Sequence, residues 1–283
     1  MEKLKCKYCK SDAIKIFKNG AECQNCKTVS VIQMPTDDEI KNYYLKFNEN
    51  YTGGGPASNQ ILYAIEYKKL VNNYCKNFSK LLDVGCSNSP FPNLIKNSNK
   101  DLSVAVLDVV KPLKLSDSII FYNGLIDNQE SILDENKFDV ITAWAVIEHV
   151  KNVDKSLYNI SNALNEKGFL FITTPEIGTW LSNFNIGKTP WFSPPEHLHI
   201  MSPICLKKIA KQYGLNCIKN GHFEISLPRF IIRYYIIGLI ETIIGIAVKI
   251  ISKNLFDKLK LKRISKYKGI HYLVFQKVIN TQI

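Results

Sequence analysis

Four cysteines near the start of the 283-residue chain have the spacing of metal ligands. They form two CxxC pairs, Cys6 with Cys9 and Cys23 with Cys26, and thirteen residues separate the pairs. Each pair can turn two thiolates toward one tetrahedral ion, and a closed set of four leaves no open position for water. The spacing therefore predicts a structural Zn²⁺ in a zinc ribbon over residues 1–35. The alternative is two unrelated cysteine pairs.

A second group of residues that could do chemistry lies in the stretch 190–202. Glu196, His197 and His199 fall there within four residues of one another. An imidazole with its ordinary pKa of about 6.5 can take a proton from a hydroxyl group. The pattern predicts His197 as a general base, with Glu196 and His199 as further catalytic candidates. The alternative is that the two histidines only anchor the loop.

A glycine turn after an apolar strand predicts a place where the backbone can approach a ligand. The strand is 80–84, and it runs through Asp83 into Gly85. Further along, the strand 102–108 ends in Asp108, whose carboxylate can accept hydrogen bonds from ribose hydroxyls. We expect these two features to form one nucleotide-binding site at the carboxyl ends of neighbouring strands.

Strands and helices alternate through the middle of the chain, and this pattern is typical of a parallel α/β sheet. After the strand 138–145, Glu148 and His149 lie at a corner, where a capping or core-bonding role is favoured over catalysis. The remaining predicted elements are strands at 168–175, 216–225 and 269–277 and helices at 92–96, 154–164 and 202–213.

These motifs resemble the class I S-adenosylmethionine-dependent methyltransferases over residues 43–223 and 269–277. The resemblance is carried by Leu-Asp-Val-Gly-Cys at 82–86, by Asp108, and by the strand 138–141 with the segment 146–150 after it. It implies an α/β fold with a doubly wound, Rossmann-like seven-stranded sheet behind the small zinc ribbon, and S-adenosylmethionine as cofactor. The implied cofactor-binding residues are Tyr51, Asp83, Gly85, Cys86, Ser87, Asp108 and Trp144.

The same resemblance implies how the chain is divided into domains. Residues 36–75 would be a linker with helices that cover the cofactor, and 76–283 would be the methyltransferase domain with an insertion at 228–268 before its last strand. The chain departs from the family pattern at Ser87 and Ser89, where glycine is usual. We therefore expect the two serine side chains to lower the affinity for the cofactor.

A zinc ribbon ahead of such a domain resembles bacterial methyltransferases that act on sugars and related polar acceptors. Glu196 and His197 match the end of the Tyr-His-Glu-His stretch of zinc-containing sugar C-methyltransferases, but Pro194 and Pro195 depart from that stretch. The long C-terminal domain of those enzymes is absent, so the resemblance implies O-methylation of a sugar or related acceptor in cell-surface glycan biosynthesis. The alternatives are an RNA methyltransferase and a non-catalytic cofactor-fold scaffold in a glycan-assembly complex.

Charge and hydropathy single out the segment 229–268, which carries +8 of the net +12. Within it, 230–251 has one apolar face, and a cluster of lysines and arginines follows at 253–268. An amphipathic helix beside a basic cluster predicts contact with an anionic membrane surface, where a lipid-linked sugar could be presented. The alternative is a lid or dimer helix.

The start of the chain lacks the apolar segment of a secretory signal, so we expect a cytoplasmic protein. If the segment 230–268 contacts a membrane, it would do so at the inner face. Nucleic acid is a disfavoured partner because few aromatic residues accompany the basic residues.

Overall fold

The computed structural model describes residues 4–17, 20–36, 38–40, 42–43, 57–128, 136–175, 192–223 and 270–279. The predicted cofactor contact Tyr51 and the apolar and basic segment 230–268 lie outside these residues. The chain divides into two compact units, Met1–Gly221 with Ile270–Ile283 and His222–Gly269. Within the described part of the chain, no helix combines the length and the apolar character needed to cross a membrane.

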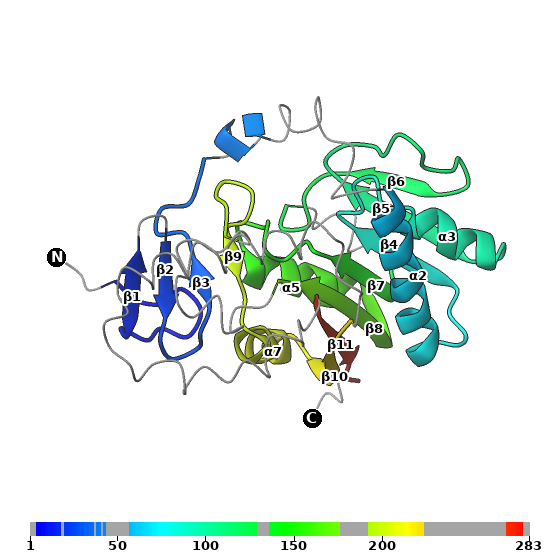
Figure 1. The fold of residues 1–283 in the computed structure, drawn as a ribbon. Helices are drawn as coiled ribbons and strands as arrows, with labels where there is room; N and C mark the ends of the chain where they lie inside the picture. The colour runs from blue at the N-terminus through cyan, green and yellow to red at the C-terminus, as the bar shows by residue number, and fades with distance from the viewer. Residues whose placement is uncertain are drawn as a thin grey trace, which may run out of the picture. The chain divides into compact units, whose positions relative to one another are not determined.

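The larger sheet of the first unit has seven strands and confirms the predicted fold (Figure 1). Their spatial order is β10-β11-β8-β7-β4-β5-β6. β4 pairs in parallel with β5 and with β7, whereas β11 pairs antiparallel with β8. The strands are β4 (Lys80–Val84), β5 (Ser103–Asp108), β6 (Ile120–Asn123), β7 (Phe138–Trp144), β8 (Leu164–Thr174), β10 (Leu215–His222) and β11 (His271–Lys277).

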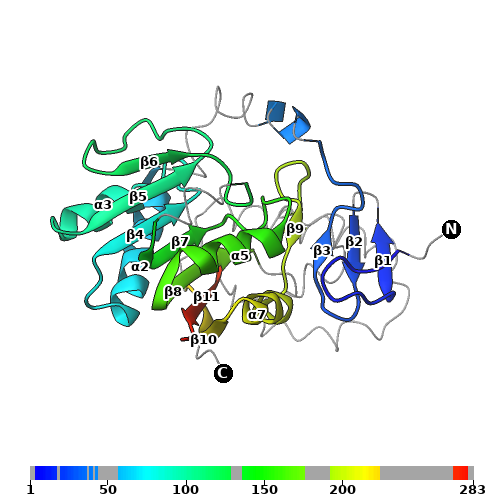
Figure 2. The same ribbon diagram turned by 180° about the vertical axis from the view of Figure 1, so that it is seen from behind.

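Helices cover both faces of this sheet, which is why its central strands are almost continuously apolar. Helices α2 (Ala57–Tyr74) and α3 (Phe91–Ser98) lie on one face, and α5 (Val153–Ala163) and α7 (Pro203–Gln212) lie on the other (Figures 1 and 2). The side chain of Asn152 caps α5 by accepting a hydrogen bond from the backbone N–H of Lys155. Such caps satisfy amide groups that have no partner within the helix.

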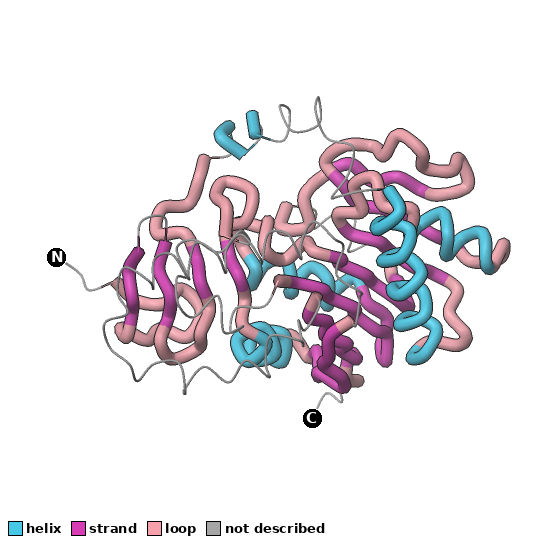
Figure 3. Tube along the Cα trace, in the orientation of Figure 1, coloured by secondary structure: helices cyan, strands magenta, loops and turns pink. Residues whose placement is uncertain are grey.

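A second, antiparallel sheet contains the ribbon strands and one strand from a distant part of the chain. The ribbon supplies β1 (Ile14–Phe17), β2 (Gly20–Cys23) and β3 (Val29–Ser30). The fourth strand is β9 (His199–Ile200), which pairs with β3, as the neighbouring strands in Figure 3 show. The loop that carries the predicted catalytic residues is thus part of the ribbon sheet.

Buried side chains also join the ribbon to the seven-stranded sheet. Cys6, Cys23 and Cys26 belong to the same buried cluster as Leu206 of α7. Phe192 packs with Val29 and Ile200 in a smaller cluster. The ribbon and the larger sheet therefore share a hydrophobic interior within this unit.

Candidate functional site

The turn after β4 requires a glycine. Gly85 has a φ of +64°, and a Cβ built on it would lie 2.7 Å from Cγ2 of Val146. Its N–H donates to the carbonyl of Leu107 on the neighbouring strand at 2.8 Å. Without a side chain, the turn leaves room for its backbone to approach a ligand, and cofactor binding there stays a prediction.

Asp83 lies at the end of β4, just before this turn, and is fully buried. Its Oδ1 accepts a hydrogen bond from the hydroxyl of Thr142 at 2.5 Å, whereas Oδ2 has no partner among the described residues. Burial raises the pKa of Asp83 to about 8, although the Thr142 hydroxyl opposes this shift. An unpartnered, buried carboxylate oxygen fits a cationic ligand group such as the amino group of S-adenosylmethionine.

Asp108 joins the end of β5 to the glycine turn. Its Oδ2 accepts from the N–H of Ser87 at 2.7 Å, and its Oδ1 accepts from the N–H of Val110 at 3.3 Å. Burial raises the pKa of Asp108, and these backbone hydrogen bonds oppose the shift. The carboxylate thus lies at the carboxyl end of β5, where the sequence predicts a ribose contact.

The two serines that replace the usual glycines have different surroundings. Ser87 has a φ of 48°, the left-handed conformation that favours glycine, and its side chain is exposed. The hydroxyl of Ser89 accepts from the N–H of Phe91 at 3.2 Å, at the start of α3. The fold accommodates both serines, and their predicted effect on cofactor affinity stays a prediction.

Trp144 and Cys86, two further predicted cofactor contacts, are largely buried. The ring of Trp144 stacks on that of Tyr67 at a centroid distance of 4.1 Å and meets Phe91 edge-on at 5.5 Å. Its Nε1 has no hydrogen-bond partner among the described residues. These contacts give Trp144 a packing role against α2 and α3, and its contact with the cofactor stays a prediction.

A second group of titratable side chains gathers at the carboxyl end of β7. Ligand atoms of Glu148, His149 and His197 all lie within 4.8 Å of one another. The rings of the two histidines meet at a centroid distance of 4.6 Å. We call these three residues the Glu148 cluster. The sequence predicted His197 as a catalytic residue but favoured a capping or core-bonding role for Glu148 and His149. The position of these two residues directly after a central strand was a signal for this edge of the sheet.

Burial sets the protonation of the Glu148 cluster. It raises the pKa of the fully buried Glu148 to about 8 and lowers that of His149 to about 3. The Nδ1 of His149 lies 2.8 Å from the carbonyl oxygen of Glu196, so in the neutral ring Nδ1 is the donor and Nε2 keeps the lone pair. One carboxylate and two imidazoles could hold a divalent cation, or they could hold a proton.

His199 is not available for catalysis, which contradicts the prediction. Its side chain is fully buried, and burial lowers its pKa to about 3. Its Nδ1 lies 2.9 Å from the hydroxyl of Tyr8, and its Nε2 lies 3.1 Å from the carbonyl of Val150. Glu196 remains partly exposed, with its carboxylate accepting from the hydroxyl of Ser193 at 3.4 Å.

The four N-terminal cysteines converge as their spacing predicts. The Sγ atoms of Cys6 and Cys26 lie 3.7 Å apart, and those of Cys9 and Cys23 lie 3.4 Å apart. All four sulfur atoms fall within 4.8 Å of one another. A zinc ion with bonds of about 2.3 Å to sulfur needs sulfur atoms about 3.8 Å apart, so this set fits a tetrahedral ion.

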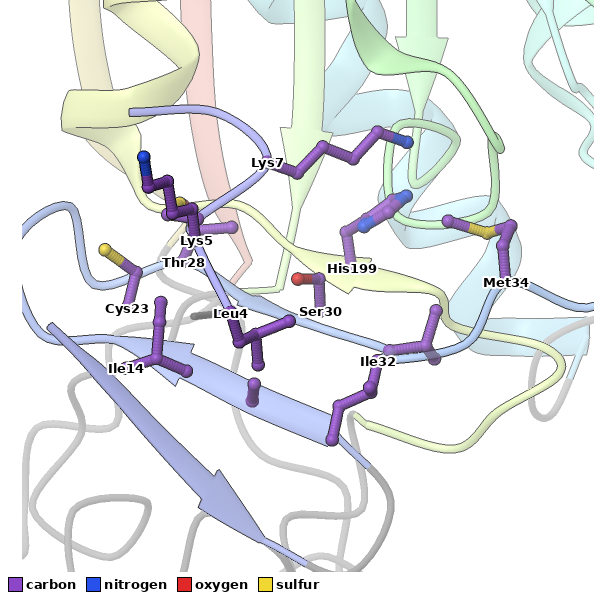
Figure 4. Close-up of a pocket in the computed structure, with 13 residues that line it drawn as sticks. Leu4, Lys5, Lys7, Ile14, Cys23, Thr28, Ser30, Ile32, Met34 and His199 are labelled. Carbon is purple, nitrogen blue, oxygen red and sulfur yellow. The ribbon is translucent and has the colours of Figure 1, made fainter. Parts of the chain in front are cut away.

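A cavity of about 210 Å³ lies within the ribbon region, and Cys6 and Cys23 are among its lining residues. Figure 4 shows His199 and Ser30 on its wall, near Lys7 of the N-terminal segment. Its lining includes neither Gly85 nor any member of the Glu148 cluster. We therefore do not place the reaction there.

Comparison with known proteins shows which family of α/β proteins this chain belongs to. A family described as a methyltransferase domain matches residues 60–220, more than half of the chain. The chain belongs to this methyltransferase family. The matched span contains Gly85, Asp108 and the Glu148 cluster, so the candidate site lies inside the family domain.

Solved structures show that this methyltransferase has the fold of the family. A SAM-dependent methyltransferase from Archaeoglobus fulgidus is 18% identical with a TM-score of 0.53, covering 83% of this chain and 100% of that chain. The 1,6-didemethyltoxoflavin-N1-methyltransferase of Burkholderia thailandensis, solved with S-adenosylhomocysteine, is 12% identical with a TM-score of 0.54, covering 93% and 100%. At these identities the likeness concerns the fold.

One curated relative matches this methyltransferase over a short stretch. The ubiquinone biosynthesis O-methyltransferase of Glaesserella parasuis serovar 5 (strain SH0165) is 46% identical over 46 residues. The match covers 16% of this chain and only 20% of that protein's length. It therefore supports the family and does not carry the relative's substrate to this chain.

Proposed function

We propose that this protein transfers a methyl group from S-adenosylmethionine to a hydroxyl oxygen of a polar acceptor, a sugar or a related compound. The observation that carries the proposal is the position of His197. It is partly exposed and belongs to the Glu148 cluster, which follows the strand beside the glycine turn. Val146, which packs against Gly85, precedes Glu148 by two residues.

The cofactor would be held at the carboxyl ends of β4 and β5. The backbone of the Gly85 turn would contact its amino-acid part, with Asp83 opposite the amino group, and Asp108 would accept from the ribose hydroxyls. When bound, S-adenosylmethionine supplies a methyl carbon whose bond to sulfur breaks as the acceptor oxygen attacks it, leaving the electron pair on sulfur. Alignment of the two reactants provides much of the acceleration in such a displacement.

Within the Glu148 cluster, His197 is the residue best suited to take the hydroxyl proton. Glu148 is fully buried, and its pKa of about 8 keeps much of it protonated at neutral pH. His149, with a pKa of about 3, stays neutral near pH 7 and is too weak a base to take the proton efficiently. An imidazole nitrogen of His197 would therefore receive the proton, while His149 packs against its ring.

The four clustered cysteines would hold a structural zinc ion, because their donor set and spacing suit a closed tetrahedral site. The sugar acceptor is supported by the resemblance to bacterial sugar methyltransferases. Presentation of a lipid-linked acceptor would depend on 230–268, which lies outside the described residues.

The test is transfer of labelled methyl groups from S-adenosylmethionine into cell extract fractionated into lipid-linked glycan, nucleotide sugars and RNA. We expect label in a saccharide fraction. His197→Asn should lower the rate at least about 100-fold, because general bases contribute that much or more. Its affinity for S-adenosylhomocysteine, measured by calorimetry, should stay within about twofold. His222→Asn, a histidine outside the cluster, is the matched control.

Three results would count against the proposal in different ways. Label in RNA would mean that the acceptor is RNA and not a sugar or a related compound. No label in any fraction, together with no binding of S-adenosylhomocysteine, would indicate a scaffold. Activity that requires a divalent ion bound by Glu148, His149 and His197 would make His197 a metal ligand and refute its role as base.

A further inference from the structure

The first CxxC turn of the ribbon, Cys6–Cys9, contacts the loop that carries His197. Tyr8 lies between Cys6 and Cys9, and its hydroxyl is 2.9 Å from Nδ1 of His199. The opposite ring nitrogen of His199 is 3.1 Å from the carbonyl oxygen of Val150, which can only accept. In the neutral ring Nε2 therefore donates to Val150, and Nδ1 accepts from Tyr8. One buried imidazole thus connects the ribbon to the segment next to Glu148 and His149.

Backbone hydrogen bonds hold the same loop from both sides. The N–H of Val31 in the ribbon donates to the carbonyl of Leu198 at 3.0 Å. The N–H groups of Leu198 and His199 both donate to the carbonyl of Glu148, at 2.8 and 3.2 Å. His197 immediately precedes these hydrogen-bonded residues. The ribbon on one side and the turn after β7 on the other therefore restrict the position of its backbone.

The second CxxC turn, Cys23–Cys26, and the residues after it are hydrogen-bonded to the far end of the loop. The hydroxyl of Ser202 donates to the carbonyl of Cys26, and the N–H of Ser202 donates to the hydroxyl of Thr28 at 3.3 Å. Ser202 is also the cap of α7. Both CxxC turns therefore contact the 198–202 segment, and the shape of each turn depends on the thiolates that it presents to one ion.

We propose that Tyr8 is a positioning residue for the methyl transfer, acting through His199 to hold His197 at the acceptor side of the site. The inference rests on the proposed role of His197. The zinc ribbon is then part of the acceptor side of the enzyme, in addition to being a stabilising appendage. The Tyr8 hydroxyl is bonded to His199, whereas Asp108 accepts from the N–H groups of Ser87 and Val110, so we expect cofactor affinity not to depend on Tyr8.

The test compares Tyr8→Phe with wild type in the full-length, zinc-loaded protein. The substitution keeps the ring, which meets that of His199 edge-on at 5.6 Å, and removes only the hydroxyl. We expect methyl transfer into the labelled extract fraction to fall about tenfold, with the affinity for S-adenosylhomocysteine unchanged within about twofold. Tyr213→Phe, which removes a tyrosine hydroxyl bonded to Asp154 on α5, is the matched control and should keep the wild-type rate.

Two readouts separate positioning from general stability. In ¹³C-histidine spectra, which contain only five histidines, Tyr8→Phe should shift the signals of His199 and His197. Amide hydrogen exchange at 196–200 should accelerate, and zinc removal by a chelator should reproduce this change without loss of S-adenosylhomocysteine binding.

If Tyr8→Phe retains the wild-type rate, exchange and His197 signals, the inference is wrong, whatever His197→Asn does. If His197→Asn is fully active, the proposed function fails first. A wild-type rate of Tyr8→Phe beside an inactive His197→Asn would overturn this inference alone.

Discussion

The two histidines of the 197–199 segment face different surroundings although a single residue separates them. In a strand, successive side chains point to opposite faces, so alternate residues share a face. Here, however, the strand β9 begins only at His199, and His197 lies in the loop before it, after the turn at 194–196. His199 is fully buried with both nitrogens bonded, whereas His197 stays partly exposed. Of the two, His197 is therefore the one that we propose contacts the substrate.

At the same scale, Gly85→Ala tests the cofactor turn. Alanine at a φ of +64° costs about 1–2 kcal/mol, and its Cβ would clash with Val146. We expect at least tenfold weaker binding of S-adenosylhomocysteine by calorimetry. Gly214→Ala is the control, because Gly214 has a similar φ of +73° but only an ordinary contact with Val278 at 3.4 Å. Equal affinities for the two variants would show that the turn does not bind the cofactor.

Glu148→Gln tests the buried carboxyl group through pH. Its pKa is raised from 4.5 to about 8, so between these values the folded state binds more protons than the unfolded state. Wild-type stability should therefore fall as pH rises from about 4.5 to 8, by on the order of 1 kcal/mol per pH unit at most. Glutamine does not titrate, so the melting temperature of the variant minus that of wild type should increase through this window and level off above it.

The measurement is thermal melting of both proteins between pH 5 and 9. Glu166→Gln, at an exposed position on β8, provides the comparison. A difference in melting temperature that is the same at pH 5 and pH 8 for Glu148→Gln would mean that the carboxyl group is ionised throughout, and the protonation argument for His197 would lose its basis.

At the scale of elements, the two-residue strand β9 is the contact between the loop and the ribbon. Its register with β3 places Ile200 opposite Val29 and His199 opposite Ser30. Two residue pairs provide few hydrogen bonds, so side-chain packing must contribute to the pairing. Phe192, only 6% exposed, supplies that packing with Val29 and Ile200 and meets Phe17 edge-on at 5.6 Å.

Phe192→Ala should therefore loosen the ribbon sheet. Truncation of a buried phenylalanine costs about 3 kcal/mol or more. We expect a lower free energy of unfolding in denaturant and faster amide exchange in β1, β2 and β3. Phe169→Ala, which removes a partly buried ring that stacks on Phe171 of the large sheet, should destabilise the protein without this local effect. Protection of β3 as in wild type would refute the packing role of Phe192.

At the scale of the whole molecule, the net charge indicates which kinds of partner the protein attracts. The chain carries +12, and the segment 229–268 holds most of it, outside the described residues. A local excess of positive charge beside an apolar stretch attracts anionic lipid surfaces by about 1 kcal/mol for each lysine or arginine near the surface. The proposed contact with a membrane therefore depends on the charge and apolar composition of the segment 229–268.

Flotation with liposomes tests the proposed contact with an anionic membrane. The full chain should float with vesicles of anionic phospholipid at low salt, float less at high salt, and stay behind with neutral vesicles. Replacement of 230–268 by a short glycine-serine linker should abolish flotation. Substitution of Lys5, Lys10 and Lys15 by glutamine, which lowers the charge of the ribbon, should not. Equal behaviour of wild type and the linker variant would remove the membrane from the proposal.

The sequence predicted the elements whose signal is local. The strands ending near Asp83 and Asp108, the helix 154–164 and the two CxxC pairs were recognisable because hydrophobic period and ligand spacing are properties of neighbouring residues. The edge strand β6, with partly exposed residues, gave no comparable pattern and was not located. The parallel sheet followed from the alternation of strands and helices.

Only the tertiary structure decided which of these residues meet. Strand β9 is two residues long, and nothing in its sequence indicates pairing with a strand about 170 residues earlier, so the burial of His199 could not be foreseen. The grouping of Glu148 and His149 with His197 likewise depends on how the loop packs against the turn after β7. Periodicity and spacing describe neighbours along the chain, whereas a side chain's burial and partners are set by segments that approach only when the chain is folded.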